Sequence, residues 1–245
     1  MQLVLTHAKY QFLETVRIPI AVIGNVFFPA AVMVFFVVPF TGDDPAAATL
    51  ATASVVTFAL MMSSLFQYGV GVAEDRAQPW DPYTRTLPAG PLPRFAGRII
   101  TGLGFMGISL VAVLVVAAVA TDASIAPTRL VFAVGALVVA TVPFTLMGLA
   151  IGYAVPSKAA LALAQLLFFP LAFGGGLLGP PGEGPGFVEA VAPYLPTRGV
   201  AELMWAAVGD YRINRVALLM LGVWILGMGI LAIWAYRRDE GRRFS

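Results

Sequence analysis

Six stretches of this 245-residue chain contain no charged residue. Crossing the hydrocarbon core of a bilayer takes about 20 apolar residues in a helix, and each stretch is long enough for this. Backbone groups inside a bilayer must bond to one another, which leaves helices or closed barrels, and continuous apolar runs exclude the barrel. We therefore predict an all-α integral membrane fold with six transmembrane helices. The uncharged runs are residues 18–42, 45–73, 99–121, 130–157, 159–182 and 216–236.

The composition is that of a chain embedded in lipid, because 59% of the residues are hydrophobic and only 11% are charged. Six spans leave little sequence for a water-soluble domain, so we expect a single transmembrane domain over residues 1–245. The two longest polar segments, 74–98 and 183–215, fall on opposite sides of the membrane in this arrangement. The expected spans are approximately 18–40, 47–73, 99–120, 130–155, 159–178 and 216–236.

Positive charges are distributed unevenly between the two sides that six spans define. With the N-terminus inside, eleven of the fifteen Lys and Arg residues fall on inner segments. Cytoplasmic segments carry such an excess, so both termini are predicted in the cytoplasm. The basic residues lie beside spans and form no basic stripe, which argues against a nucleic-acid partner. The four outer residues are Arg129, Arg198, Arg212 and Arg215.

Residues 1–17 have the pattern of an amphipathic helix. Apolar side chains, among them Phe12 and Leu13, recur near one helical face, whereas Lys9 lies with other polar residues mostly on the opposite face. We predict an interfacial helix that ends near Arg17 and rests on membrane lipid. The alternative is a disordered polar leader, because both faces contain exceptions.

The loop over residues 74–98 combines charges of both signs, aromatic residues and several prolines. These features favour a short helix with anchors at both ends, presented to a protein partner on the cytoplasmic side. A solvated connector with an interfacial tryptophan is the alternative. The candidate partner-contacting residues are Glu74, Asp75, Arg76, Trp80, Arg85, Thr86, Leu87 and Pro88.

The segment over residues 179–215 contains two short apolar pieces, 187–193 and 201–208, separated by Pro193, Tyr194, Leu195 and Pro196. Pieces this short cannot cross a bilayer, so we predict re-entrant or interfacial half-helices packed against protein. A plain surface loop is the alternative, and the apolar content fits it poorly.

Residues for catalysis or metal binding are scarce. His7 is the single histidine and there is no cysteine, so a histidine-based metal site or catalytic triad cannot form within this chain. Neither Lys9 nor Lys158 belongs to the G-x-x-x-x-G-K-[ST] motif that binds nucleotide phosphates. We expect no catalytic residue, metal or cofactor here, and any ATP energy must come from another subunit. A membrane lipid enzyme is a remote alternative, since only 74–81 approaches an acidic cluster.

No charged residue lies within the six runs, whereas many ion-coupled carriers need intramembrane charges, so a secondary transporter is disfavoured. Uncharged polar residues do occur there, and they can either line a path or bond helices together. The candidates for a substrate path are Asn25, Ser64, Gln67 and Gln165.

Two glycine patterns lie within spans. Gly102, Gly104 and Gly107 match the G-x-G-x-x-G pattern, but the third span is not the strand-turn-helix context that binds a pyrophosphate. Close helix packing is the better interpretation, and Gly148 and Gly152 form a second small-xxx-small pair of this kind.

The order and spacing of these features resemble one family over nearly the whole chain, the permease subunits of type 2 ABC exporters, including daunorubicin-resistance-type drug exporters. No single motif is specific; the combination over six spans carries the resemblance. The motifs are Arg17-Ile18-Pro19, Glu74-Asp75-Arg76, Thr84-Arg85-Thr86-Leu87-Pro88-Ala89, Pro156-Ser157-Lys158-Ala159-Ala160, Pro170 in the fifth span, and Pro193-Tyr194-Leu195-Pro196.

The resemblance implies a role for each segment. The leader would be a connecting helix, residues 74–98 would contain a coupling helix that docks on the ATPase, and residues 179–215 would be re-entrant. Pro79-Trp80-Asp81-Pro82 departs from the family pattern, which puts the start of the coupling helix in doubt by a few residues.

The resemblance also implies an assembly in the bacterial cytoplasmic membrane. A second permease, identical or homologous, and two ATP-binding subunits that hold ATP and Mg would complete an exporter. The expected substrate is hydrophobic or amphipathic, such as a drug, lipid or peptide, because the spans carry no charge to neutralise a charged solute. A non-transport membrane anchor or scaffold for a soluble partner is the alternative.

Overall fold

The computed structural model describes residues 2–41, 44–80 and 92–241, and within these ranges it contains helices and no strand. Six helical stretches are long and apolar enough to cross a membrane. This confirms the prediction of an all-α chain with six spans. The stretches are Val22–Thr41, Pro45–Ala77, Phe95–Ala120, Pro127–Ala154, Ser157–Gly174 and Arg215–Glu240.

Two of the six spans are interrupted by a wider, π-helical turn. The first span comprises α2 (Pro19–Val32), the π-helical η1 (Met33–Val37) and α3 (Val38–Thr41). The second comprises α4 (Pro45–Ser64), the π-helical η2 (Leu65–Val70) and α5 (Gly71–Ala77). The other spans are the single helices α7 (Leu92–Ala120), α8 (Pro127–Ala154), α9 (Ser157–Gly174) and α12 (Arg215–Gly241). The shorter elements are α1 (Gln2–Val16), α10 (Gly186–Val191), the 3₁₀ turn η3 (Ala192–Tyr194) and α11 (Pro196–Val208).

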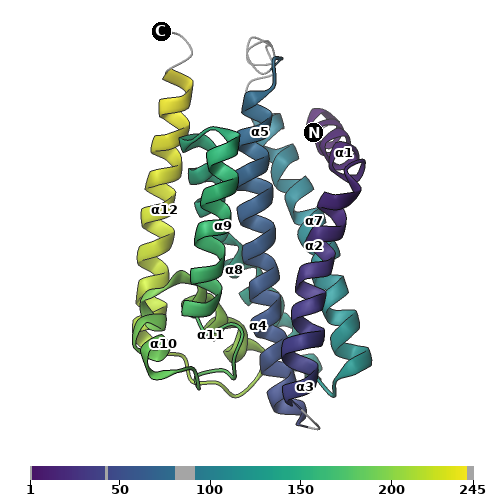
Figure 1. The fold of residues 1–245 in the computed structure, drawn as a ribbon, viewed down its shortest axis with the longest axis vertical. Helices are drawn as coiled ribbons and strands as arrows, with labels where there is room; N and C mark the ends of the chain where they lie inside the picture. Colours follow the sequence, from purple (N-terminus) through teal and green to yellow (C-terminus); the bar gives the residue numbers. More distant parts are fainter. Residues whose placement is uncertain (1, 42–43, 81–91, 242–245) are drawn as a thin grey trace.

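The long helices run side by side, and α1 lies at the same end of the bundle as α5 and the last turns of α12 (Figure 1). We call this the terminal end. The helices α10 and α11 lie at the opposite end, which we call the distal end (Figure 1). The charged residues that interrupt the apolar pattern therefore gather at the two ends of the bundle.

The second span is the core of the bundle. Its most apolar window is 72% buried against other protein, whereas the corresponding windows of the other five spans are between 17% and 33% buried. Residues such as Ala53, Ser54 and Thr57 are small enough to let neighbouring helices approach on several sides. The outer spans instead expose large apolar side chains such as Phe35 and Leu226. These suit contact with lipid.

Two glycines of α8 allow that helix to touch η2. A Cβ atom on Gly148 would lie 2.6 Å from the carbonyl oxygen of Ser64, and one on Gly152 would lie 2.6 Å from the carbonyl oxygen of Tyr68. Any larger residue would push the helices apart. The predicted packing role of this pair is confirmed.

A reciprocal pair of hydrogen bonds joins α2 to α7. Pro29 has no N–H, so the carbonyl of Asn25, four residues earlier, lacks its usual helical donor. The Oγ of Ser109 donates to this carbonyl at 2.8 Å, and Asn25 Nδ2 donates to the carbonyl of Phe105 at 2.8 Å. Polar side chains here satisfy backbone groups that a proline leaves open inside the bilayer.

Candidate functional site

The N-terminal helix α1 packs on the terminal half of α7. Ala8 is buried in the contact, and Thr101 Oγ1 donates a hydrogen bond to its carbonyl at 3.1 Å. The ring of Phe12 stacks on Phe105 with centroids 4.9 Å apart. Lys9 and Leu13 of α1 are exposed, and so is Arg17, the residue directly after this helix. The segment is helical and attached to a span, and its position in the membrane interface stays a prediction.

At the start of the predicted coupling segment, Asp75 and Arg76 turn towards other helices. Arg98 of α7 forms an ion pair with Asp75 at 3.0 Å, and its Nη2 donates to the carbonyl of Gln67 at 3.2 Å. Gly71 makes room for this guanidinium, because a Cβ there would lie 1.9 Å from Arg98 Nη2. Arg98 thereby fastens α5 to α7.

Arg76 joins the second span to two further helices. Its Nη1 donates to the carbonyls of Gly152 at 2.6 Å and Val155 at 3.2 Å, at the C-terminal end of α8. Its Nη2 lies 2.5 Å from the buried carboxylate of Asp239, near the end of α12. A cation at a helix C-terminus satisfies open carbonyls and favours the helix dipole. We call this the Arg76 clamp.

Three aromatic rings lie beside the Arg76 clamp and join the same helices. Phe95 of α7, Tyr153 of α8 and Tyr236 of α12 have ring centroids 5.2 to 5.9 Å apart. The guanidinium of Arg76 lies 5.8 Å from the centre of the Tyr153 ring. The terminal ends of α5, α7, α8 and α12 therefore form one packed unit.

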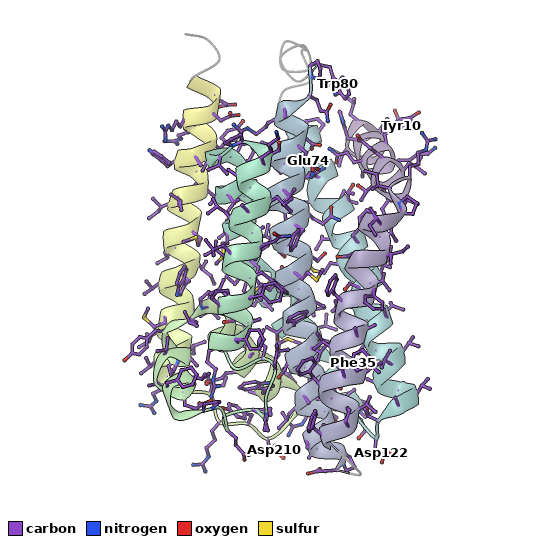
Figure 2. The ribbon with its side chains drawn as sticks, in the orientation of Figure 1. Tyr10, Phe35, Glu74, Trp80, Asp122 and Asp210 are labelled. Carbon is purple, nitrogen blue, oxygen red and sulfur yellow. The ribbon has the colours of Figure 1, made fainter. Side chains whose placement is uncertain are left out.

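Glu74 and Trp80 differ from their neighbours, since both are exposed at the terminal end (Figure 2). They are available to a partner, whereas Asp75 and Arg76 make the internal contacts described above. The predicted contacts Arg85, Thr86, Leu87 and Pro88 lie outside the described residues. The structure therefore locates four of the eight candidate coupling residues.

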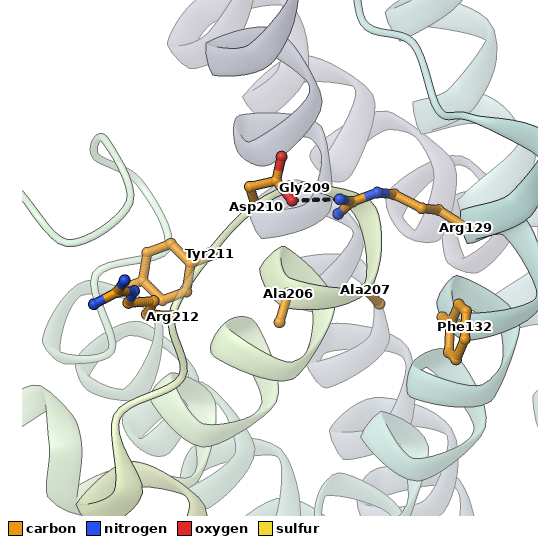
Figure 3. Close-up of a pocket in the computed structure, with 8 residues that line it drawn as sticks. All are labelled: Arg129, Phe132, Ala206, Ala207, Gly209, Asp210, Tyr211 and Arg212. Carbon is orange, nitrogen blue, oxygen red and sulfur yellow. Dashed lines mark hydrogen bonds and ion pairs between the residues drawn. The ribbon is translucent and has the colours of Figure 1, made fainter.

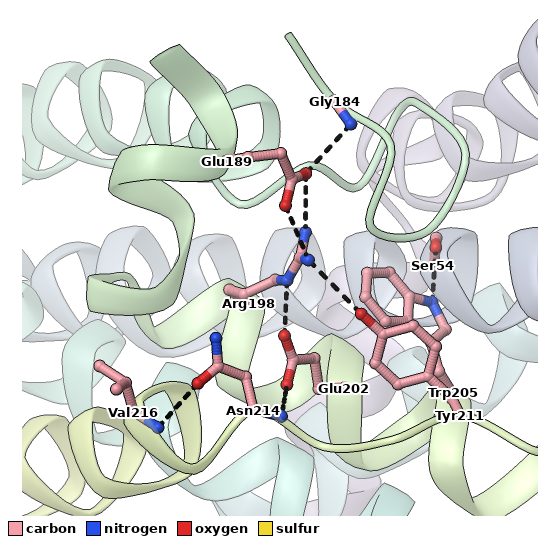
Figure 4. Close-up of polar contacts among 9 residues, drawn as sticks. All are labelled: Ser54, Gly184, Glu189, Arg198, Glu202, Trp205, Tyr211, Asn214 and Val216. Carbon is pink, nitrogen blue, oxygen red and sulfur yellow. Dashed lines mark hydrogen bonds and ion pairs between the residues drawn. The ribbon is translucent and has the colours of Figure 1, made fainter. Parts of the chain in front are cut away.

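A buried ionic cluster occupies the distal end (Figure 4). Arg198 of α11 donates through Nε to Glu202 at 2.8 Å and through both Nη atoms to Glu189 of α10 at 3.2 and 3.0 Å. The second carboxylate oxygen of Glu202 accepts from the backbone N–H of Asn214 at 2.5 Å. Arg198 is 4% and Glu202 1% exposed, so both charges depend on these partners. We call this the Arg198 cluster.

The surroundings of Arg198 favour its charged form. Burial by itself would lower the pKa of Arg198, but the hydrogen bond to Glu202 and the nearby carboxylates outweigh it, so the pKa is raised. Burial raises the pKa of Tyr211, whose hydroxyl lies 3.5 Å from Arg198 Nη2. The next turn of α11 is tied to the core, because Trp205 Nε1 donates to Ser54 Oγ of α4 at 2.9 Å.

The predicted proline segment connects α10 to α11. Pro193 lies in η3, and the buried Pro196 is the first residue of α11. Tyr194 is exposed, while its carbonyl accepts a hydrogen bond from Trp224 Nε1 of α12 at 2.9 Å. The segment contains two short helices with α11 buried against protein; its depth in the membrane stays a prediction.

The four candidate path residues occupy different environments. Asn25 is buried in the α2–α7 contact, and Ser64 is buried where α8 approaches closest. Gln67 is half-buried in η2, and Gln165 is exposed on α9. Helix-to-helix bonding describes Asn25 in this structure, and a path role for the set stays a prediction.

A pocket of about 570 Å³ opens at the distal end between α8 and the α11–α12 connection (Figure 3). Arg129 reaches across it to pair with Asp210. The lining residues are Arg129, Phe132, Ala206, Ala207, Gly209, Asp210, Tyr211 and Arg212.

The sequence of residues 2–207 matches the family described as ABC-2 type transporter. The match covers α1, the first five spans, and nearly all of α11. The chain belongs to the ABC-2 type transporter family. A Bacillus subtilis (strain 168) protein named "Putative transport permease YvfS" is 21% identical over 187 residues, which are 76% of each chain. The ABC-2 permease described here is therefore a multi-pass transmembrane subunit of an ABC transporter.

Membership of the ABC-2 type transporter family implies that an ATP-binding ABC subunit is the partner of this permease. The matched region ends before α12, so Asp239 and the rest of that helix lie outside it. Asp239 is not among the residues predicted from the sequence, because only the fold brings it to Arg76. Glu202 is not among them either, although its spacing of four residues from Arg198 is a pattern that favours a helical ion pair.

Proposed function

We propose that this ABC-2 permease is the transmembrane subunit of an exporter that moves a hydrophobic or amphipathic substrate out of the cytoplasm. A second permease, identical or homologous, and two ATP-binding subunits with ATP and Mg would complete the assembly. The observation that carries the proposal is the Arg76 clamp, which fastens the expected ATPase-docking segment to a helix that runs to the distal end.

The positions of the basic residues in the bundle support the proposed orientation. Lys9, Arg17, Arg76 and Arg98 lie on elements of the terminal end, and Arg237 and Arg238 lie in the last turns of α12. Cytoplasmic segments carry such an excess of basic residues. The terminal end would therefore face the cytoplasm, with the distal end on the outer side.

The docking surface would begin at α5 and continue into residues 81–91. Glu74 and Trp80 are exposed there, while the adjacent Asp75 and Arg76 bind α7, α8 and α12. Because Asp75 and Arg76 form ion pairs with residues of α7 and α12, the segment moves with those helices. An ATPase that pushed on Trp80 would thus displace several spans and not only a loop.

The helix α12 supplies a route from this clamp to the distal end. It is continuous from Arg215 to Gly241, and Asp239 lies near its last turn. At its other end, Asn214 immediately before the helix donates to Glu202 of the Arg198 cluster. A rigid helix with an ionic anchor at each end can transmit a displacement between two arrangements of the bundle. ATP-driven closure at the terminal end would in this way shift α11 at the distal end.

The placement of the charged side chains supports the proposed substrate class. The buried charged residues Arg198, Glu202 and Asp239 lie at the two ends of the bundle and are paired. Between those ends, the exposed faces of the described spans are mostly apolar and include the uncharged Gln165. A charged solute would lack a neutralising partner midway, which favours a hydrophobic or amphipathic one.

The deciding experiment purifies the tagged permease from native membranes in a mild detergent and assays the complex for vanadate-sensitive ATP hydrolysis. We expect a partner with a nucleotide-binding motif and ATPase activity. Glu74→Lys should weaken its co-purification, whereas the matched Glu183→Lys, an exposed glutamate at the distal end, should not. Co-purification of a partner without that motif would favour the anchor or scaffold function and contradict the proposal.

A further inference from the structure

The pocket at the distal end has the chemistry of an anion site beside lipid. Its walls come from the first turns of α8, with Arg129 and Phe132, and from the α11–α12 connection, with Asp210 and Arg212 (Figure 3). Ala206 and Ala207 of α11 are small, which leaves a volume of about 570 Å³. The pocket lining therefore includes two arginines, one carboxylate and two aromatic rings, those of Phe132 and Tyr211.

The carboxylate is a replaceable partner of Arg129. The side chain of Asp210 is 96% exposed, compared with 32% for Arg129. Ion pairs of such exposed groups contribute little, because water competes for both charges. A phosphate can accept bidentate hydrogen bonds from Arg129. Arg129 therefore favours an incoming phosphate over Asp210, whose carboxylate pairs with Arg129 when no phosphate is bound.

The level of the pocket along the bundle matches a lipid headgroup. The spanning helices that flank it begin at Pro127 and Arg215, so their first turns mark the boundary between hydrocarbon and water. Arg129 and Arg212 lie within three residues of these starts. Their guanidinium groups are therefore at the depth at which phosphates of that leaflet lie.

An apolar strip leads from the pocket along α8 towards the bilayer centre. Phe132 is 68% exposed, and Val139 and Val142, on the same helical face at a spacing of seven and ten residues, are also exposed. Between them, a Cβ atom on Gly135 would meet nothing within 4 Å. An acyl chain can lie against this shallow strip while its headgroup occupies the pocket.

We infer that the pocket binds the phosphate of an anionic phospholipid from the leaflet at the distal end, with one acyl chain along the Phe132 strip. The guanidinium of Arg129 binds the phosphate and Asp210 is the carboxylate it displaces. Arg212, whose guanidinium lies beyond the Tyr211 ring and points away from Arg129, adds positive charge at the rim (Figure 3). This site is independent of the direction of transport and of the ATPase.

The test is native mass spectrometry of the purified full chain titrated with dioleoylphosphatidylglycerol or dioleoylphosphatidylcholine. We expect preferential binding of phosphatidylglycerol, weakened about ten-fold in the variant Arg129→Gln/Arg212→Gln. Arg215→Gln is the matched control, because this arginine is also exposed at the distal end but does not line the pocket. It should bind phosphatidylglycerol like the wild type.

Asp210→Asn separates lipid binding from a merely structural ion pair. It breaks the same pair but leaves both arginines, so phosphatidylglycerol should bind about two- to five-fold more tightly. Equal binding of the two lipids, equal loss in Arg215→Gln, or weaker binding in Asp210→Asn would overturn the inference. Complete displacement of phosphatidylglycerol by inorganic phosphate at equal concentration would show a free-phosphate site and overturn the choice of lipid.

Discussion

Arg76 and Asp239 are 163 positions apart in the chain, yet Arg76 Nη2 and Asp239 Oδ1 lie 2.5 Å from each other. The pair joins the terminal end of the second span, the most buried of the six, to the last turns of the sixth. Because Arg76 also binds two carbonyls at the end of α8, one guanidinium holds three helices together where the partner ATPase is expected.

Replacing Arg76 by Gln should destabilise the permease and uncouple it from ATP hydrolysis. The change leaves the buried carboxylate of Asp239 without its cation, which costs about 2–4 kcal/mol in a partly buried pair. Unfolding in SDS, followed by circular dichroism, measures the loss in stability, and transport per ATP hydrolysed measures the loss in coupling.

The double variant Arg76→Gln/Asp239→Asn is the control for this prediction. It removes the unpaired charge and should recover part of the stability. The loss of stability in the double variant should be about 1–2 kcal/mol smaller than the sum of the losses in the two single variants. Coupling should remain impaired, because the neutral pair holds α5 to α12 less firmly. Additive effects on stability would contradict a direct interaction.

The sequence predicted the spans because the bilayer imposes a local rule. A run of about 20 residues without charge can be read off directly, and so can small residues such as Gly148 and Gly152 that permit close packing. The short apolar pieces around Pro193 likewise predicted two short helices. These features depend on neighbouring residues only.

The contacts that connect the two ends could not be predicted, since they join residues far apart in the chain. Nothing local in the sequence links Asp239 to Arg76, or Ser109 to the carbonyl of Asn25. The Arg198–Glu202 pair was readable from its spacing, but Glu189 and Asn214 reach the same cluster only after α10, α11 and α12 have packed.

Replacing Arg198 by Met should destabilise the distal end strongly. Glu202 would remain buried without a cation, at a cost of about 3–5 kcal/mol. The variant Arg198→Met/Glu202→Met should be closer to the wild type, because apolar residues of similar size tolerate burial. Unfolding in SDS measures both. A double variant as unstable as the single one would show that the cluster stabilises through its geometry and not through charge neutralisation.

The stability of the distal end should fall at alkaline pH through Tyr211. Its pKa is raised by burial above the ordinary value of 10.0, so the folded state retains the phenolic proton longer than the unfolded state. The stabilising contribution is therefore complete below about pH 10 and lost as the pH rises further. Tyr211→Phe should have a shallower decline of unfolding free energy between about pH 9.5 and 11. An unchanged slope would exclude Tyr211 as the source.

Adding one methyl group to Gly148 should disturb the core of the bundle. The new Cβ would lie 2.6 Å from the carbonyl oxygen of Ser64, the last residue of α4, so α8 must shift, at a cost of about 1–3 kcal/mol. Gly135→Ala is the matched control on the same helix, since its Cβ would meet nothing within 4 Å. That variant should be neutral or slightly stabilising, because alanine favours helix. Equal melting temperatures for the two variants would contradict the close approach.

Replacing both Pro193 and Pro196 by Ala should impair transport more than assembly. Pro193 fixes the backbone of η3 and Pro196 that of the first residue of α11, so together they set the angle between α10 and α11. Other buried contacts of α11, such as that of Trp205 with Ser54, remain in the variant and should keep the permease folded. Transport into proteoliposomes, normalised to the amount of assembled complex, measures the effect.

The control is Pro127→Ala, another first helical residue, at the start of α8. If the angle between the short helices matters for release, the control retains transport and the double variant does not; equal transport in both would assign these prolines a purely local role.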